Sequence, residues 1–149
     1  WSNLRRTVPK CPPGEVPLPG GTPPDFTSFR AEFITWGVLS ARTTDRLLRI
    51  YGTRALEVLK LAAKDPSLAD TFNQEADAIA AEVVFSFTHE MAETLADCLL
   101  RRTMVGLNSA CGLDVVDAVA KIAQQFLGWT DDQVTREKAD YRQYVAQLR

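Results

Sequence analysis

From residue 25 onward, hydrophobic residues recur at spacings of three and four positions rather than in alternation. This spacing is typical of amphipathic helices, whereas strands would alternate apolar and polar residues. Glycine is sparse in this region and runs of β-branched residues are short. The sequence therefore predicts an all-α fold, a single compact multi-helix domain.

The first helices have recognisable ends. Asp25 is the expected N-cap of a helix that continues to about Trp36. A short helix is expected to begin at Thr43 or Thr44 and to end at Gly52, whose lack of a side chain suits a C-cap, and a third helix follows. The residues expected to face the core are Phe26, Phe29, Phe33 and Trp36, then Leu47, Leu48 and Tyr51, then Ala55, Val58, Leu59 and Ala62.

Two helices are expected between residues 76 and 103, either separate or joined in one kinked rod. A long helix then ends at Gly128, and Thr130 with Gln133 forms a capping box for the last helix. The expected inward stripes are Ala76, Ile79, Ala80, Val83 and Phe87; Met91, Leu95, Cys98 and Leu99; Val115, Val119, Ile122, Ala123 and Phe126; and Val134, Tyr141, Tyr144, Val145 and Leu148.

The first 24 residues have a different composition. Residues 9–24 contain seven of the eight prolines. Proline removes backbone donors and fixes φ, so neither a helix nor a central strand is expected there. We predict a Pro/Gly-rich leader over residues 1–24 that serves as a connector.

Charge and length narrow the class of protein. The chain has 149 residues and a net charge of −2, which suits one globular domain and gives no basic surface for nucleic acid. No apolar run approaches the ~20 residues of a membrane-spanning helix.

The cysteines, Cys11, Cys98 and Cys111, are odd in number and lack CxxC spacing, so we expect free thiols in a reduced, cytoplasmic setting.

Residues 82–103, EVVFSFTHEMAETLADCLLRRT, contain the chain's single histidine. A zinc site on a helix would need a second histidine, and His89 with Glu93 supplies at most two ligands where three are required. Helical rise separates Cys98 from His89 by ~13 Å, so Cys98 is interpreted as a core residue. We therefore expect no catalytic, cofactor-binding or metal-binding residue in this chain.

Polar residues in this segment form a candidate cluster, which comprises His89, Glu90, Glu93, Asp97, Arg101 and Arg102. Two pairs within it are spaced i,i+4, His89 with Glu93 and Asp97 with Arg101, so each pair is expected to interact across one helical turn. The cluster is expected to orient the two helices or to face another domain. Contact of the arginine pair with a substrate phosphate is the less favoured alternative.

This segment resembles the C-terminal helical domain of FAD-dependent glycerol-3-phosphate dehydrogenases and α-glycerophosphate oxidases, in which Glu-Val, His-Glu, Thr-Leu-x-Asp and Arg-Arg-Thr follow in the same order. The VPLPGG sequence at residues 16–21 is similar to the element that leaves the flavin domain in that family. Tyr51-Gly52 and Leu127-Gly128-Trp129 also match in family order.

The resemblance implies a longer parent enzyme, which oxidises sn-glycerol 3-phosphate to dihydroxyacetone phosphate with FAD and passes electrons to quinone or oxygen. Residues 1–24 would then connect an upstream flavin domain to a C-terminal α-helical cap domain, residues 25–149. FAD would belong to the parent and none would bind to this chain. The implied partner is the parent's own flavin domain, and the parent's peripheral association with the inner membrane and its homodimerisation stay open.

Two other classes of function remain as alternatives. An independent helical module could dock a partner helix through its Phe/Trp face, and an exposed apolar patch would support that hypothesis. DNA binding by two short helices is disfavoured by the acidic charge balance and by the lack of a basic recognition helix.

Overall fold

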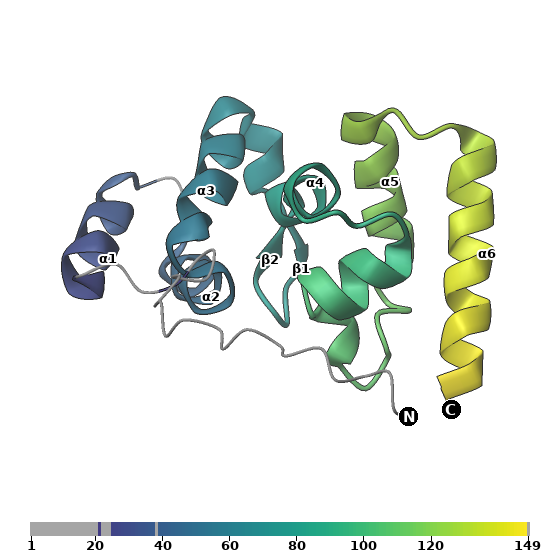
Figure 1. Ribbon diagram of the computed structural model, residues 1–149. Coiled ribbons are helices and arrows are strands. Elements are labelled where there is room, and N and C mark those ends of the chain that lie inside the picture. The colour runs from purple at the N-terminus through teal and green to yellow at the C-terminus, as the bar shows by residue number, and fades with distance from the viewer. Residues whose placement is uncertain (1–20, 22–24, 38, 149) are drawn as a thin grey trace, which may run out of the picture.

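The computed structural model describes residues 21, 25–37 and 39–148. Helices dominate these residues, so the predicted all-α class is confirmed (Figure 1). The leader predicted for residues 1–24 lies outside the described residues, except for Gly21. Asp25 precedes the first helix.

In chain order the elements are α1 (Phe26–Thr35), α2 (Ala41–Tyr51), η1 (Gly52–Arg54), α3 (Ala55–Lys64), η2 (Pro66–Ala69), β1 (Thr71–Asn73), β2 (Ala78–Ile79), α4 (Ala80–His89), η3 (Asp97–Arg102), η4 (Val105–Leu107), α5 (Val116–Leu127) and α6 (Asp131–Leu148). The element η3 is a π-helix, and η1, η2 and η4 are 3₁₀-helices.

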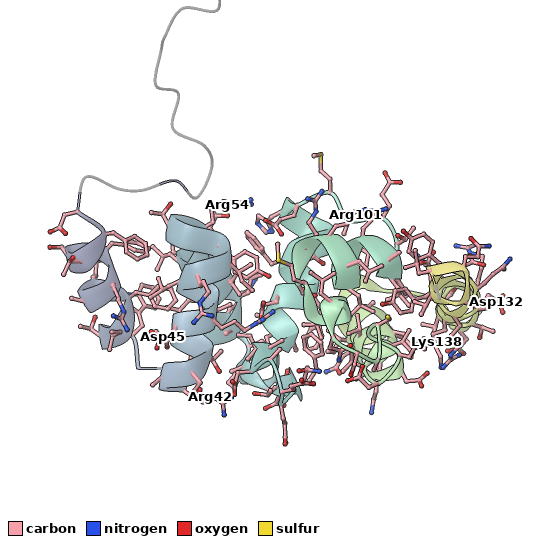
Figure 2. The ribbon with its side chains drawn as sticks, turned by 90° about the horizontal axis from the view of Figure 1, so that it is seen from below. Arg42, Asp45, Arg54, Arg101, Asp132 and Lys138 are labelled. Carbon is pink, nitrogen blue, oxygen red and sulfur yellow. The ribbon has the colours of Figure 1, made fainter. Side chains whose placement is uncertain are left out.

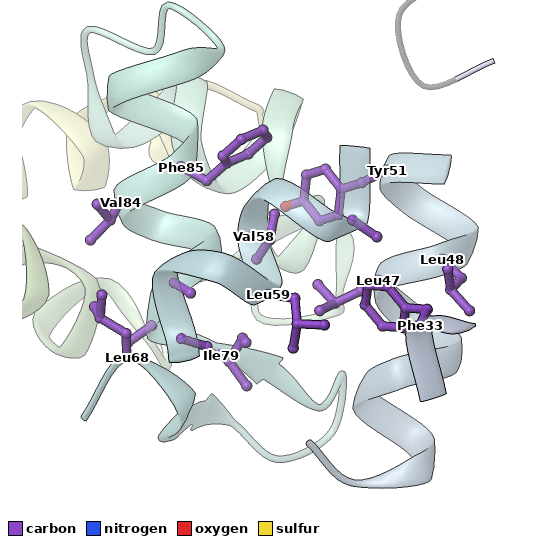
Figure 3. Packing of buried hydrophobic residues seen from close by; sticks show 14 residues of the cluster. Phe33, Leu47, Leu48, Tyr51, Val58, Leu59, Leu68, Ile79, Val84 and Phe85 are labelled. Atoms are coloured by element: carbon purple, nitrogen blue, oxygen red, sulfur yellow. The ribbon is translucent and has the colours of Figure 1, made fainter. Parts of the chain in front are cut away.

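Helix α4 lies between two hydrophobic cores. In Figure 1, α1 to α3 lie on one side of it and α5 and α6 lie on the other. Phe85 and Val84 pack with residues of α1, α2 and α3 (Figure 3), and Val83 packs with residues of η3, α5 and α6. Every residue from Ala80 to Ser86 is buried, because the helix is covered on all sides.

The predicted helix ends are largely confirmed. The Asp25 carboxylate accepts hydrogen bonds from the backbone N–H groups of Thr27 and Ser28, and it therefore caps α1. Gly128 has φ 73° at the end of α5, and the Thr130 hydroxyl accepts the backbone N–H of Gln133 at the start of α6.

Helix α2 begins earlier than predicted. Its N-cap is Ser40, whose hydroxyl accepts the backbone N–H of Thr43 at 3.1 Å. Thr43 and Thr44 are buried inside the helix and do not start it. Gly52 adopts φ 56°, as expected of a C-cap, and the chain continues through η1 directly into α3.

The predicted helix from Ala76 is wrong at its start. Residues 71–79 form an antiparallel hairpin in which Thr71 pairs with Ile79 and Asn73 with Ala78. The Asn73 side-chain carbonyl accepts the Ala76 backbone N–H at 2.6 Å, which closes a turn and gives the backbone an alternative to the helix. Helix α4 begins only at Ala80.

The signature segment forms two separate elements rather than one rod. Helix α4 ends at His89, and the chain turns before η3, with Met91 at φ 55°. Met91 is 83% exposed, so its predicted place in the core is wrong. The helical spacing continued past a point where the backbone leaves the helix.

Some predicted stripe residues lie at the surface. On α1 only Phe33 is buried, whereas Phe26 and Trp36 are exposed, because α1 is at the edge of the molecule and meets neighbours on one side (Figure 1). On α6, Tyr144 and Leu148 are exposed, although Tyr141 and Val145 are buried as predicted.

Tyr141 holds the turns between η3 and α5. Its hydroxyl donates to the Cys111 carbonyl at 2.7 Å. A Cβ atom at Gly112 would lie 2.6 Å from the Tyr141 hydroxyl oxygen, and one at Gly106 would lie 2.7 Å from a Leu100 methyl carbon. The two glycines therefore allow α6 to approach these turns closely.

Two glycines with positive φ give a matched test of this contact. Gly112→Ala is expected to lower the free energy of unfolding by about 2 to 4 kcal/mol, because left-handed strain adds to a clash with Tyr141. Gly128→Ala, where nothing lies within 4 Å of the added Cβ, is expected to lose only about 1 kcal/mol. Urea unfolding of both variants measures the difference, and equal losses would contradict the close approach.

Candidate functional site

The most deeply buried charged side chain is Glu82, in the first turn of α4, and it is 0% exposed. Its Oε1 atom accepts the backbone N–H of Ile79 at 3.0 Å and so caps its own helix. Arg46 of α2 donates from Nε to Oε1 at 3.2 Å and from Nη2 to Oε2 at 3.1 Å. Tyr51 donates its hydroxyl hydrogen to Oε2 at 3.0 Å.

Arg46 also reaches the far end of the signature segment. Its Nη2 atom donates to the Thr103 backbone carbonyl at 2.7 Å. The backbone N–H and the hydroxyl of Thr103 each donate to the Cys98 carbonyl at 2.9 Å, which closes the wide π-helical turn of η3. Thus one guanidinium joins α2, the start of α4 and the end of η3. We call Arg46, Tyr51, Glu82 and Thr103 the Glu82 network.

Burial shapes the protonation of this network. Desolvation raises the pKa of Glu82, and the Arg46 charge and hydrogen bonds from Arg46, Ile79 and Tyr51 oppose that rise. The pKa of Tyr51 lies well above its usual range, because its ring is buried and the Glu82 carboxylate is beside its hydroxyl. Tyr51 therefore stays protonated as a donor to Glu82.

The sequence analysis missed this network. Glu82 is the one charged residue within residues 78–88, an otherwise apolar and hydroxylic run, and a carboxylate in such a run needs donors. That signal could have indicated burial. It could not have identified Arg46, which lies 36 residues earlier on a helix with other arginines.

Of the predicted polar cluster, Asp97 and Arg101 do form an ion pair across one turn. Asp97 also caps the helical turn that begins before η3, since its carboxylate accepts the backbone N–H groups of Glu93 and Thr94, each at 3.2 Å. Burial raises the pKa of Asp97, but the hydrogen bond from the Thr94 hydroxyl, together with those backbone bonds and the one from Arg101, lowers the pKa below its usual value.

The expected helical pairing of His89 with Glu93 is wrong, because α4 ends at His89 and the chain turns before Glu93. The His89 ring instead stacks on Phe85, with ring centres 4.9 Å apart, and its Nδ1 atom lies 2.6 Å from the Thr88 hydroxyl oxygen. This part of the cluster is therefore tied to α4 and not to η3.

Glu90 takes a partner from outside the predicted cluster. Arg54 of η1 donates to Glu90 at 3.0 Å and to the His89 backbone carbonyl at 3.4 Å, and its guanidinium lies 4.8 Å from the centre of the Phe85 ring. These contacts fix the end of α4 against η1. Arg102 has a buried Nε atom that finds no hydrogen-bond partner among the described residues.

A further buried carboxylate comes from the last helix. Glu137 of α6 accepts the backbone N–H of Leu95 at 3.1 Å, at the start of the helical turn that leads into η3. A donor that would be left unpaired at a helix start is thereby satisfied from 42 residues later.

Cys98 is fully buried, as predicted. Desolvation raises the pKa of its thiol to about 12, so this thiol is a poor nucleophile. In the part of the chain that the structure describes, no group of three or more His, Cys, Asp or Glu side chains is placed to hold a metal ion. None of the helices described there is long and apolar enough to cross a bilayer.

The geometry defines a helical domain whose charged residues link its elements to one another. The family model of the C-terminal domain of alpha-glycerophosphate oxidase matches residues 11–134, and the chain belongs to this family. The recognised resemblance of residues 82–103 is thereby confirmed.

Curated relatives point in the same direction. Glycerol-3-phosphate dehydrogenase from Synechocystis sp. is 29% identical over 99% of this chain and 27% of its own length. Glycerol-3-phosphate dehydrogenase from Mycobacterium leprae is 35% identical over 66% of this chain and 17% of its own length. Glycerol-3-phosphate dehydrogenase 2 from Mycobacterium bovis is 33% identical over 64% of this chain and 16% of its own length. The chain thus spans about a quarter or less of these relatives. No solved structure matches it.

Removal of Arg46 tests the Glu82 network. Arg46→Ala is expected to lower the free energy of unfolding by about 3 to 5 kcal/mol, because it leaves the Glu82 charge buried without its ion-pair partner. The control is Arg30→Ala, which breaks a pair with Asp45 that is half exposed on both sides and is expected to change stability by less than about 1 kcal/mol. Denaturant unfolding of both variants decides, and similar losses would show that the network is not a main support.

The raised pKa of Glu82 predicts a pH dependence that Glu82→Gln isolates. Between the ordinary pKa of about 4.5 and the raised value in the fold, the unfolded chain loses the Glu82 proton while the folded chain keeps it. The stability of the wild type relative to Glu82→Gln is therefore expected to fall as pH rises through this window and then to level off. Thermal melts of both proteins from pH 4 to 8 measure it, and a relative stability that rises with pH would reverse the sign of the shift.

Proposed function

We propose that this chain is the C-terminal helical domain of a flavoprotein that oxidises sn-glycerol 3-phosphate to dihydroxyacetone phosphate with FAD and passes the electrons to quinone or oxygen. The observation that carries the proposal is the family match over residues 11–134, which is supported by relatives named glycerol-3-phosphate dehydrogenase. The activity is that of the longer parent, since this chain spans only part of those relatives.

Within that parent we assign this chain a structural role, without catalytic residues of its own. The support is that three signature residues are engaged in contacts within the domain: Glu82 and Thr103 with Arg46 of α2, and Asp97 with Arg101 inside η3. A side chain committed to such contacts is not free to bind a substrate.

FAD is assigned to the rest of the parent because the local geometry does not fit a dinucleotide. A dinucleotide-binding fold needs a strand that leads through a glycine-rich turn into a helix. In the described residues β2 runs directly into α4 at Ala80, without a glycine between them. The proposed compartment of the parent is the cytoplasm, with peripheral contact at the inner membrane and homodimerisation as open properties.

A second candidate function is an independent interaction module, and one observation favours it. Phe26 and Ile34 of α1 are 37% and 53% exposed, and Trp36, the C-cap residue of α1, is 42% exposed. These apolar side chains lie on a helix at the edge of the fold, where a partner helix could pack. This candidate explains α1 but not the family match.

Flavin binding and oxidation of glycerol 3-phosphate are expected to require the part of the parent that lies outside this chain. The purified chain should be colourless and should not reduce a dye with glycerol 3-phosphate, whereas the full-length protein should bind flavin and turn over. Visible absorbance and dye reduction measure both. Flavin binding or turnover by the 149-residue chain alone would overturn this assignment.

A further inference from the structure

A cavity of about 290 Å³ lies between α6 and the segment that contains η3. Its wall on α6 consists of Glu137, Asp140, Tyr141 and Tyr144. Spacings of three and four residues place these four side chains on one face of the helix. Ligand pockets range from roughly 300 to 1,000 Å³, so this cavity suits a small molecule. Two carboxylates and two aromatic rings thus share one small cavity.

Glu137 is a buried carboxylate without a counter-ion. It is 9% exposed, and its Oε2 atom accepts the backbone N–H of Leu95 at 3.1 Å. No ion pair joins Glu137 or Asp140 to a cation among the described residues. The Oε1 atom of Glu137 accepts no hydrogen bond from a described residue and is not a fully buried atom, so it is open to the cavity. Glutamate is rarely buried unless it is paired, so a positive charge is missing here.

The cations around the cavity are bound to other carboxylates. Lys138 and Arg142 of α6 both pair with Asp117 of α5. Figure 2 shows Lys138 on the lower side of the molecule and Arg101 on the upper side. Arg101 lines the cavity, but it pairs with Asp97. The missing positive charge must therefore come from a ligand.

We propose that this cavity binds a free, small organic ammonium ion, whose N–H groups donate to Glu137 Oε1 and to the Asp140 carboxylate, and whose charge contacts the rings of Tyr141 and Tyr144. Ammonium groups form charge-assisted hydrogen bonds with carboxylates, and aromatic rings attract cations. The Tyr141 hydroxyl already donates to the Cys111 carbonyl, so Tyr141 contributes its ring. The site needs neither flavin nor glycerol 3-phosphate and is independent of the proposed function.

A metal ion fits this cavity less well than an ammonium ion. Among the described residues, no group of three or more His, Cys, Asp or Glu side chains is placed to hold a metal ion. Mg²⁺ and Ca²⁺ take about six or more oxygen ligands, whereas two carboxylates line this cavity. An ammonium ion needs few acceptors and gains from the aromatic walls.

Ligand-observed NMR on the full-length protein tests the proposal, with n-butylammonium as the probe. Saturation transfer to the probe is expected to be saturable, with a Kd between about 0.1 and 10 mM, as a few charge-assisted contacts imply. 1-Butanol has the same chain without the charge. It is expected to bind at least about tenfold more weakly, because neither the carboxylates nor the rings attract it as a cation.

Variants of the α6 wall locate the binding. Glu137→Gln removes the charge but keeps an oxygen for the Leu95 N–H, and it is expected to weaken binding about tenfold or more. Tyr144→Leu is expected to weaken binding several-fold, whereas Tyr144→Phe keeps the ring and the wild-type affinity. The matched control is Asp132→Asn, which removes one charge at the outer edge of the same helix, away from the cavity wall (Figure 2), and is expected to leave the Kd unchanged.

Circular dichroism checks that each variant folds. Should Glu137→Gln fail to fold, Asp140→Asn replaces it, because Asp140 is exposed and forms no ion pair with a described residue. Its expected effect is a several-fold weaker affinity for n-butylammonium.

Three results would overturn the proposal. They are equal binding of n-butylammonium and 1-butanol, wild-type affinity in both Glu137→Gln and Asp140→Asn, and no saturable binding up to about 50 mM probe. Nα-acetyl-lysine amide separates a free ion from a lysine side chain of a protein. Similar affinities for it and for n-butylammonium are expected, and binding more than about tenfold tighter would assign the cavity to a protein partner and overturn the free ion.

Discussion

A carboxylate buried away from water needs hydrogen-bond donors around it, and the donors to Glu82 come from distant parts of the chain. Its partners are a helix start three residues away, a guanidinium and a phenol from α2, and through that guanidinium the carbonyl of Thr103. None of these groups can shift independently, because each is also part of a helix end or a packed core. The position of α4 relative to α2 and η3 therefore follows from one buried ion pair.

This constraint matters because α4 belongs to both cores. Phe85 and Val83 point into different clusters, so a rotation of the helix would disturb both at once. The hydrophobic contacts alone are not directional and would tolerate small rotations. The bidentate contact of Arg46 with Glu82 fixes one direction, and the cores are packed around it. The signature segment is thus a structural unit whose first and last residues meet at one side chain.

Local rules predicted the parts of the fold that local chemistry decides. Asp25, Gly52, Gly128 and Thr130 mark helix ends because the caps involve only neighbouring residues. The all-α class followed from spacing alone. The hairpin was missed because the two-residue strand β2 is too short to show alternation.

The candidate site was less predictable, since its contacts join residues far apart in sequence. The pair of Asp97 and Arg101 is local and was predicted, whereas the contacts of Arg46 with Glu82 and of Arg54 with Glu90 each span 36 positions. Met91 continued a helical stripe, and no local signal shows that the backbone leaves the helix there. How the polar cluster serves the parent stays a prediction.

The contact of Glu137 with Leu95 has a consequence for the order in which the domain is made. Residues of α6 leave the ribosome after all the other described elements, yet they supply the acceptor for Leu95 and the Tyr141 ring that covers the turns at Gly106 and Gly112. The half of the domain around α1, α2 and α3 can begin to pack during synthesis, because its buried residues all precede α5, and only the partly buried Ile122, Phe126 and Leu127 join it later. The half of the domain around η3 and α5 cannot complete its packing until α6 is present, and until then the backbone N–H of Leu95 lacks the Glu137 acceptor. A nascent chain that stalls before α6 therefore exposes the open second core to chaperones and proteases.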